Sequence, residues 1–297
     1  MFLRLNVLFF GLVFNLYSSA IPMPDLKQIQ LETPLYNYFS RVEPNNISQL
    51  ITQAKLTYMK KVIQNTKYNT MPLLVLNSST GGNTSYIDIP VGKITNQQIT
   101  NILSDSTNTS IVKLNGRDVI NLLERSASQY NTIKLENLDP QNIINPKYIP
   151  SNFYTLNGGI SFKIDLTQLP RYNTDGKLIN STSYRVIDLM YNNHRIDDDA
   201  QFLVIINNNI LGNGNYQINR DKIIFGALAS SKDILNNYLI TQNTITITGN
   251  KSWIILPIPG IVMYFATSSV ALKYLPLHSE FKKLKVTPNS SMLVSLK

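Results

Sequence analysis

Three consecutive asparagines, Asn207, Asn208 and Asn209, stand between a short apolar run and a polar loop that contains Gly214 and Tyr216. An asparagine side chain offers both a hydrogen-bond donor and an acceptor, and glycine lets a ligand approach the backbone closely. This pattern is typical of a loop that recognises a small polar ligand. The alternative is an ordinary hairpin with a surface loop, and this stretch alone favours that simpler interpretation.

Residue types that could hold a metal ion are sparse. The chain has no cysteine and only two histidines, His194 and His278, and neither lies in a metal-binding motif. Asp197, Asp198 and Asp199 are adjacent, so on an extended chain they point to alternate faces, and we expect a solvated turn there. The sequence therefore predicts no catalytic residue and no metal ligand, and the two histidines are expected at the surface.

Two strands must position the asparagines. The run at 201–206 is apolar and rich in β-branched residues, which is typical of a strand buried on both faces. The stretch 185–191 alternates as a half-buried strand does, and the Asn-rich turn at 192–195 follows it. A further strand is predicted at 110–114, with a turn at Asn115 and Gly116 and a helix over 118–130.

A helix is predicted over residues 44–65, with Asn45 or Asn46 as its cap. The expected inward face carries six apolar side chains at helical spacing: Ile47, Leu50, Ile51, Ala54, Tyr58 and Val62. Lys55, Lys60 and Lys61 are expected to lie mostly off that face.

Composition excludes some classes of protein. The chain has 297 residues, 43% of them hydrophobic, which is enough for a sizeable core in one or two domains. Its formal net charge is +9, but the positive residues are scattered rather than gathered in a stripe. Nucleic-acid binding is therefore not expected, although an anionic ligand would be weakly attracted.

Residues 1–20 have the pattern of a secretory signal peptide. Arg4 provides the positive start, an apolar stretch follows at 5–14, and Ser18 and Ala20 form a small-x-small cleavage site. The apolar stretch is shorter than the roughly 20 residues of a membrane span. We expect cleavage before Ile21, an exported periplasmic or secreted protein, and no membrane attachment after cleavage.

Three longer stretches resemble a known family. They are RVIDLMYNNHRIDDDAQFLVIINN at 185–208, LPRYNTDGKLIN at 169–180 and LNGRDVINLLERSASQYNTI at 114–133. Together they resemble the C-terminal domain of the bacterial 5′-nucleotidase family, in particular its 2′,3′-cyclic-nucleotide 2′-phosphodiesterase/3′-nucleotidases. The resemblance implies an α+β fold with a mixed sheet and helices packed on it. It assigns 21–66 to the family's linker helix and 67–297 to the C-terminal-type domain.

The resemblance also implies a ligand site. In the family, the nucleotide base is held between two aromatic rings, and stacking of this kind contributes roughly 1–3 kcal/mol per base. Phe153 or Tyr154 would supply the first ring, unless these side chains serve only in packing. The second ring position corresponds to Asn209, which has no ring, and Tyr216 is a possible substitute.

The family's catalytic chemistry is not expected in this chain. Family members hydrolyse phosphoesters with two divalent metals held by an N-terminal metallophosphatase domain, whose Asp-x-His and Gly-Asn-His motifs do not occur here. Three hypotheses follow: an exported domain that recognises a nucleoside or nucleotide, the substrate-binding half of a split phosphoesterase that works with a separate metallophosphatase domain, or a decayed remnant without a ligand. No cofactor is expected in this chain.

Overall fold

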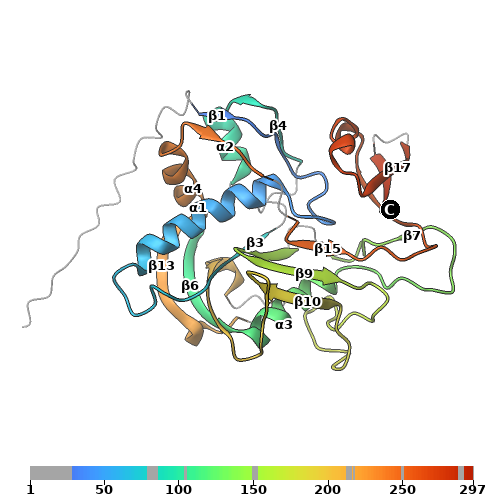
Figure 1. Cartoon of the computed structure of the whole chain (residues 1–297), viewed down its shortest axis with the longest axis horizontal. Coiled ribbons are helices and arrows are strands. Elements are labelled where there is room, and N and C mark those ends of the chain that lie inside the picture. The colour runs from blue at the N-terminus through green and yellow to red at the C-terminus, as the bar shows by residue number, and fades with distance from the viewer. Residues whose placement is uncertain are drawn as a thin grey trace, which may run out of the picture.

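The computed structural model describes residues 29–78, 86–103, 106–148, 153–211, 216, 218–248, 251–286 and 291–296. The expected signal peptide lies outside these residues. The four α-helices of the described chain pack on and around several small mixed sheets (Figure 1). The predicted α+β class is confirmed, although the strands form several sheets rather than one.

The central sheet has five strands, and its middle strand is the predicted apolar run. Along this strand, Phe202, Val204 and Ile206 join the hydrophobic core on one face, while Leu203 and Ile205 join the core on the other. Alternate side chains of a strand point to opposite faces, so a continuous apolar run is what a strand covered on both sides requires. The strand order is β13 (Ile223–Ser230), β6 (Asn108–Asn115), β12 (Gln201–Asn207), β3 (Leu73–Ser78) and β8 (Tyr154–Asn157), with β12 and β3 parallel and the other neighbours antiparallel.

Helices cover both faces of this sheet. Helices α1 (Asn46–Ile63) and α4 (Ser231–Ile240) contact each other and share a core with one face, whereas α3 (Gly116–Ala127) packs on the other (Figure 1). The predicted helix over 44–65 is thus confirmed as α1. Asn45 caps it, because the Asn45 side chain accepts a hydrogen bond from the Ser48 N–H at 2.8 Å.

Helix α3 begins earlier than the sequence pattern suggests. Asn115 and Gly116, expected to form a turn, are instead the N-cap and the first residue of the helix. Asn115 accepts from the Asp118 N–H, and the Asp118 side chain accepts from the Asn115 N–H, so the two residues form a capping box. The strand β6 therefore passes into α3 without an intervening turn.

A second mixed sheet packs beyond α3, and Arg185 attaches it to that helix. Arg185 is completely buried and donates hydrogen bonds of 2.8 and 2.9 Å to the carbonyls of Ala127 and Tyr130, where α3 ends. It also donates to the carbonyl of Gln168 and to the hydroxyl of Thr132. The strand order in this sheet is β11 (His194–Arg195), β10 (Val186–Tyr191), β9 (Ile160–Ile164) and β15 (Trp253–Ile255).

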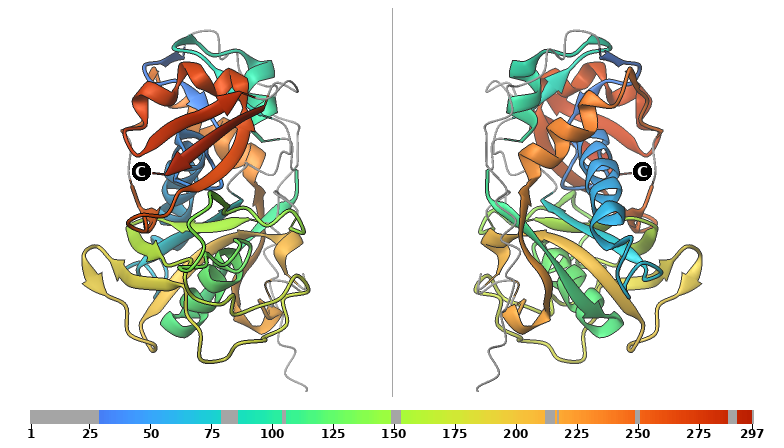
Figure 2. Two further views of the ribbon diagram at one scale, coloured as in Figure 1. Left: turned by 90° about the vertical axis from the view of Figure 1, so that its right-hand side faces the viewer. Right: turned by 90° about the vertical axis from the view of Figure 1, so that its left-hand side faces the viewer.

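The C-terminal part of the described chain forms its own sheet, which faces the viewer in the left view of Figure 2. Its order is β17 (Phe281–Val286), β18 (Ser291–Leu296), β16 (Met263–Ser268) and β7 (Gln141–Asn142).

The remaining elements are β1 (Gln30–Leu31), β2 (Leu35–Tyr36), β4 (Asp88–Ile89), β5 (Gly92–Lys93), α2 (Asn96–Ile102), β14 (Thr244–Ile245) and 3₁₀ turns at Asn208–Ile210, Arg220–Lys222, Ser269–Lys273 and Leu275–Leu277. Within the described residues, no helix has the length and apolar character needed to cross a membrane.

Candidate functional site

A buried lysine lies where the asparagine run begins. Lys55 of α1 is 2% exposed, and its Nζ donates to the Oδ1 of Asn207 at 3.0 Å and to the Oδ1 of Asn77 at 3.2 Å. Burying an ammonium group is costly unless its protons find acceptors. The side chains of Asn207 and Asn77, at the ends of β12 and β3, therefore hold a positive charge close to the edge of the central sheet.

The three asparagines have different environments. The Oδ1 of Asn207 also accepts from the hydroxyl of Ser231 at 2.6 Å, and the Oδ1 of Asn208 accepts from the hydroxyl of Ser110 at 2.6 Å. Asn209 is exposed. Two of the predicted amides thus bond within the fold and shape the site, whereas Asn209 presents its side chain to solvent.

Asn207 and Asn209 line a shallow pocket together with Lys55 and Asn77, and we call it the asparagine pocket. Its volume is about 30 Å³, far below the roughly 300–1,000 Å³ of pockets that enclose a small-molecule ligand. The pocket is therefore too small to enclose a nucleobase. The lining residues are Ile51, Lys55, Leu76, Asn77, Ser78, Leu103, Tyr154, Asn207, Asn209 and Ser231.

Of the two candidate rings, only Tyr154 lines this pocket. Tyr154 is half-buried at the start of β8. Phe153 is 1% exposed and packs with its ring centroid 5.5 Å from that of Tyr130 and 6.0 Å from that of Trp253. Its placement is that of a core side chain, so in this structure Phe153 has no accessible face for a base.

The ring of Tyr216 packs against the ring of Tyr154. The two rings meet edge to face with centroids 4.8 Å apart, and Tyr216 is 3% exposed. Its hydroxyl lies 3.0 Å from the Ser126 hydroxyl and accepts from the Gln129 side-chain amide at 3.3 Å. Burial raises the pKa of Tyr216 well above its usual range, so the phenol stays neutral. In this structure Tyr216 is a buried neighbour of Tyr154, in edge-to-face contact with it.

The remaining predicted residue, Gly214, lies outside the described residues.

Lys55 was not predicted as a site residue from the sequence, and the expectation that it lies off the apolar face of α1 is wrong. Ile47, Ile51 and Lys55 follow one another at intervals of four residues, and this spacing puts them on one helix face. That spacing was the signal that could have found the lysine.

The acidic run and the first histidine stay at the surface, as predicted. Asp197, Asp198 and Asp199 are exposed, and Asp198 forms an ion pair with the exposed side chain of Arg117. His194 is exposed in β11. His278 differs, because its side chain is only 12% exposed and pairs with Glu43, so the expectation of a surface residue is wrong for His278.

Comparison with known proteins defines the class of this fold. A 5′-nucleotidase precursor of Thermus thermophilus superimposes with a TM-score of 0.57 at 17% sequence identity, over 78% of this chain and 40% of that one. The NAD nucleotidase of Haemophilus influenzae superimposes with a TM-score of 0.53, over 80% of this chain and 39% of that one. The fold is therefore of the nucleotidase C-terminal type.

The sequence comparisons point to the same class of protein as the structural comparisons. The family model for the 5′-nucleotidase C-terminal domain matches residues 27–220. A trifunctional nucleotide phosphoesterase of Bacillus subtilis is 30% identical over 247 residues, which are 81% of this chain and 17% of that protein. A 2′,3′-cyclic-nucleotide 2′-phosphodiesterase/3′-nucleotidase of Haemophilus influenzae is 26% identical over 238 residues, which are 76% of this chain and 36% of that protein.

The chain belongs to the 5′-nucleotidase C-terminal domain family. It spans well under half the length of these relatives.

Proposed function

We propose that this chain is an exported domain that recognises a nucleoside or nucleotide at the mouth of the asparagine pocket. The observation that carries the proposal is that Tyr154, at the start of β8, and Asn209, in the 3₁₀ turn after β12, line the same pocket beside the buried ammonium of Lys55. A base would stack on the Tyr154 ring, and the Asn209 amide would offer it a donor and an acceptor. The names of the sequence relatives, which refer to nucleotides, support this ligand class.

Export rests on the sequence of residues 1–20, with Arg4 before an apolar stretch and a small-x-small site at Ser18 and Ala20. Recovery of a mature chain beginning at Ile21 from the periplasm or the medium would support this part of the proposal. Recovery of the full-length chain from inside the cell would contradict it.

Calorimetric titration of the purified protein with 3′-AMP and with adenosine tests the recognition proposal. We expect binding of both ligands, weakened about 5- to 150-fold in Tyr154→Ala because one stacked base is worth roughly 1–3 kcal/mol. Tyr264→Ala, in the separate C-terminal sheet, is the matched control and should bind as the wild type does. Absence of binding heat in a protein with a cooperative thermal transition would contradict the proposal and favour a non-binding remnant.

A second candidate function follows from the coverage of the relatives. Because this chain corresponds to only 17–36% of their length, it would act as the substrate-binding part of a phosphoesterase whose metals reside in a separate metallophosphatase domain. Mixing the purified protein with such a domain and measuring association and hydrolysis of 2′,3′-cyclic AMP tests this candidate. If the two proteins do not associate, the split-enzyme proposal fails while the binding proposal stands.

A further inference from the structure

Glu43, His278 and Glu280 converge outside the asparagine pocket. Glu43 precedes α1, whereas His278 and Glu280 precede and adjoin the start of β17, so the chain brings together segments more than two hundred residues apart. One ligand atom from each side chain lies within 4.8 Å of the others, and the Nδ1 of His278 is 2.6 Å from a Glu43 oxygen. Among the described residues, this is the group whose imidazole and carboxylates could share one metal ion.

The imidazole of His278 is held in place from several sides. Its Nε2 lies 2.9 Å from the hydroxyl of Tyr36, and its ring centroid is 4.4 Å from that of Phe39 and 5.6 Å from that of Phe281. At 2.6 Å, the Nδ1 of His278 and the Glu43 oxygen share a proton; when a metal displaces that proton, Nε2 can donate to Tyr36 and the Nδ1 lone pair can bind the metal. Metal-binding histidines are oriented in this manner, by a hydrogen bond from the nitrogen that does not bind the metal.

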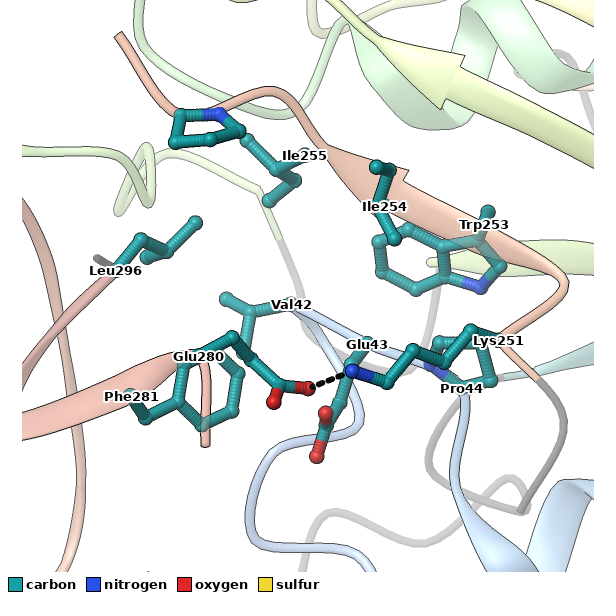
Figure 3. Close-up of a pocket in the computed structure, with 11 residues that line it drawn as sticks. Val42, Glu43, Pro44, Lys251, Trp253, Ile254, Ile255, Glu280, Phe281 and Leu296 are labelled. Atoms are coloured by element: carbon teal, nitrogen blue, oxygen red, sulfur yellow. Dashed lines mark ion pairs between the residues drawn. The ribbon is translucent and has the colours of Figure 1, made fainter. Parts of the chain in front are cut away.

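The carboxylates stand at the polar end of a largely apolar cavity of about 280 Å³ (Figure 3). Figure 3 shows the side chains of Glu43 and Glu280 reaching toward the same space from opposite segments, with Trp253 and Ile255 along the wall. Apolar walls lower the local dielectric constant, so a cation placed between the carboxylates would be held more strongly than at an open surface.

Two ion pairs give these side chains a simpler structural role. His278 pairs with Glu43, and Lys251 pairs with Glu280 at 3.1 Å (Figure 3). The lysine side chain is 64% exposed and contacts one carboxylate from the solvent side. A metal ion would take the place of the proton shared by His278 and Glu43. Lys251 can turn toward solvent when a cation binds between the two carboxylates.

We propose that Glu43, His278 and Glu280 form a zinc site. One imidazole nitrogen and two carboxylate oxygens form a ligand set of the kind found in zinc sites, while the imidazole disfavours magnesium and calcium. Zinc bonds of about 2.0–2.2 Å place tetrahedral ligand atoms about 3.3 Å apart. Small rotations of the glutamate side chains bring atoms now 2.6–4.8 Å apart to that spacing.

Calorimetric titration of the chelator-treated protein with ZnCl₂ tests the proposal. We expect one zinc per chain, and an affinity at least 10–100-fold lower in Glu280→Gln and His278→Ala, since even outer-shell changes weaken zinc by that factor. His194→Ala removes the chain's other histidine, which is exposed, and should leave zinc binding unchanged. Titration with CoCl₂ should produce the visible absorption of a tetrahedral cobalt site, and this absorption should be lost in His278→Ala.

The site does not exist if the wild type binds no zinc, or if His278→Ala binds zinc as tightly as the wild type. Loss of binding in His194→Ala would place the metal elsewhere and overturn the assignment. Glu280→Gln keeps the test valid if His278→Ala does not fold, because Glu280 is the more exposed ligand and its amide analogue preserves the shape. The zinc titration does not involve nucleotide, so its outcome is independent of the proposed nucleotide binding.

Discussion

The Nζ of Lys55 in α1 lies 3.0 Å from the Oδ1 of Asn207 at the end of β12, and it joins two elements that are 152 residues apart in the sequence. The same ammonium donates to Asn77 in β3. One buried charge therefore holds the helix to two parallel strands at the edge where the asparagine pocket lies. The lysine serves the fold as well as the proposed site.

Replacing Lys55 with Met should reduce stability. The methionine keeps the apolar stem but leaves the amide oxygens of Asn77 and Asn207 with fewer donors, so we expect a loss of about 1–3 kcal/mol in the free energy of unfolding. Urea denaturation measures the difference. Lys60→Met, at an exposed position of the same helix, is the control and should change stability little. Equal stability of the two variants would show that the buried hydrogen bonds contribute nothing net.

Asn209→Tyr should strengthen nucleotide binding. Asn209 occupies the exposed position beside Tyr154 where a second ring could cover the opposite face of a base. A second stacking partner is worth roughly 1–3 kcal/mol, so titration with 3′-AMP should show an affinity about 5- to 150-fold higher. Asn209→Leu supplies apolar area without a ring and should give a smaller gain. No gain in the tyrosine variant would mean that the base does not lie between these two positions.

Gly116→Ala should destabilise the protein despite the higher helix propensity of alanine. An added Cβ at Gly116 would lie 2.0 Å from the carbonyl oxygen of Asp197, a backbone atom that cannot rotate away. We expect a loss of about 1–3 kcal/mol, as for other overpacked sites. The control is Gly226→Ala in β13, where the added atom meets only Ile223 at 3.5 Å. Equal melting temperatures for Gly116→Ala and Gly226→Ala would contradict the close approach of Asp197 to Gly116.

Asp88 should make stability depend on pH in the acid range. Burial raises the pKa of its carboxyl, but hydrogen bonds from Lys273, Tyr274 and Tyr38 at 2.6, 2.5 and 2.9 Å outweigh burial and lower the pKa overall. The folded protein therefore binds fewer protons than the unfolded chain around the ordinary aspartate pKa. The stabilising contribution of Asp88 is complete above about pH 4 and is lost as the pH falls below it.

Urea denaturation between pH 2.5 and 7 checks this effect. The difference in stability between the wild type and Asp88→Asn should be largest near pH 7 and should shrink as the pH falls below about 4. Asp139→Asn, at an exposed position, is the control and should follow the wild-type curve. A constant difference between wild type and Asp88→Asn at all pH values would show that the carboxylate charge is not what stabilises the contact.

Local patterns in the sequence predicted much of the fold. The continuous apolar run at 201–206 predicted a strand covered on both faces, and helical spacing predicted α1, because both patterns arise from the geometry of a single element. The family resemblance came from the three stretches at 114–133, 169–180 and 185–208, which can be recognised in the sequence without a structure. These features require no knowledge of distant contacts.

The sequence alone determined the fold class, the family and the segment that carries the asparagines. Only the tertiary structure decided that Phe153 packs against Trp253 while Tyr154 lines the pocket, because Trp253 comes a hundred residues later in the sequence. It likewise brought Glu43 to His278, since convergence of distant segments depends on how sheets pack rather than on local spacing.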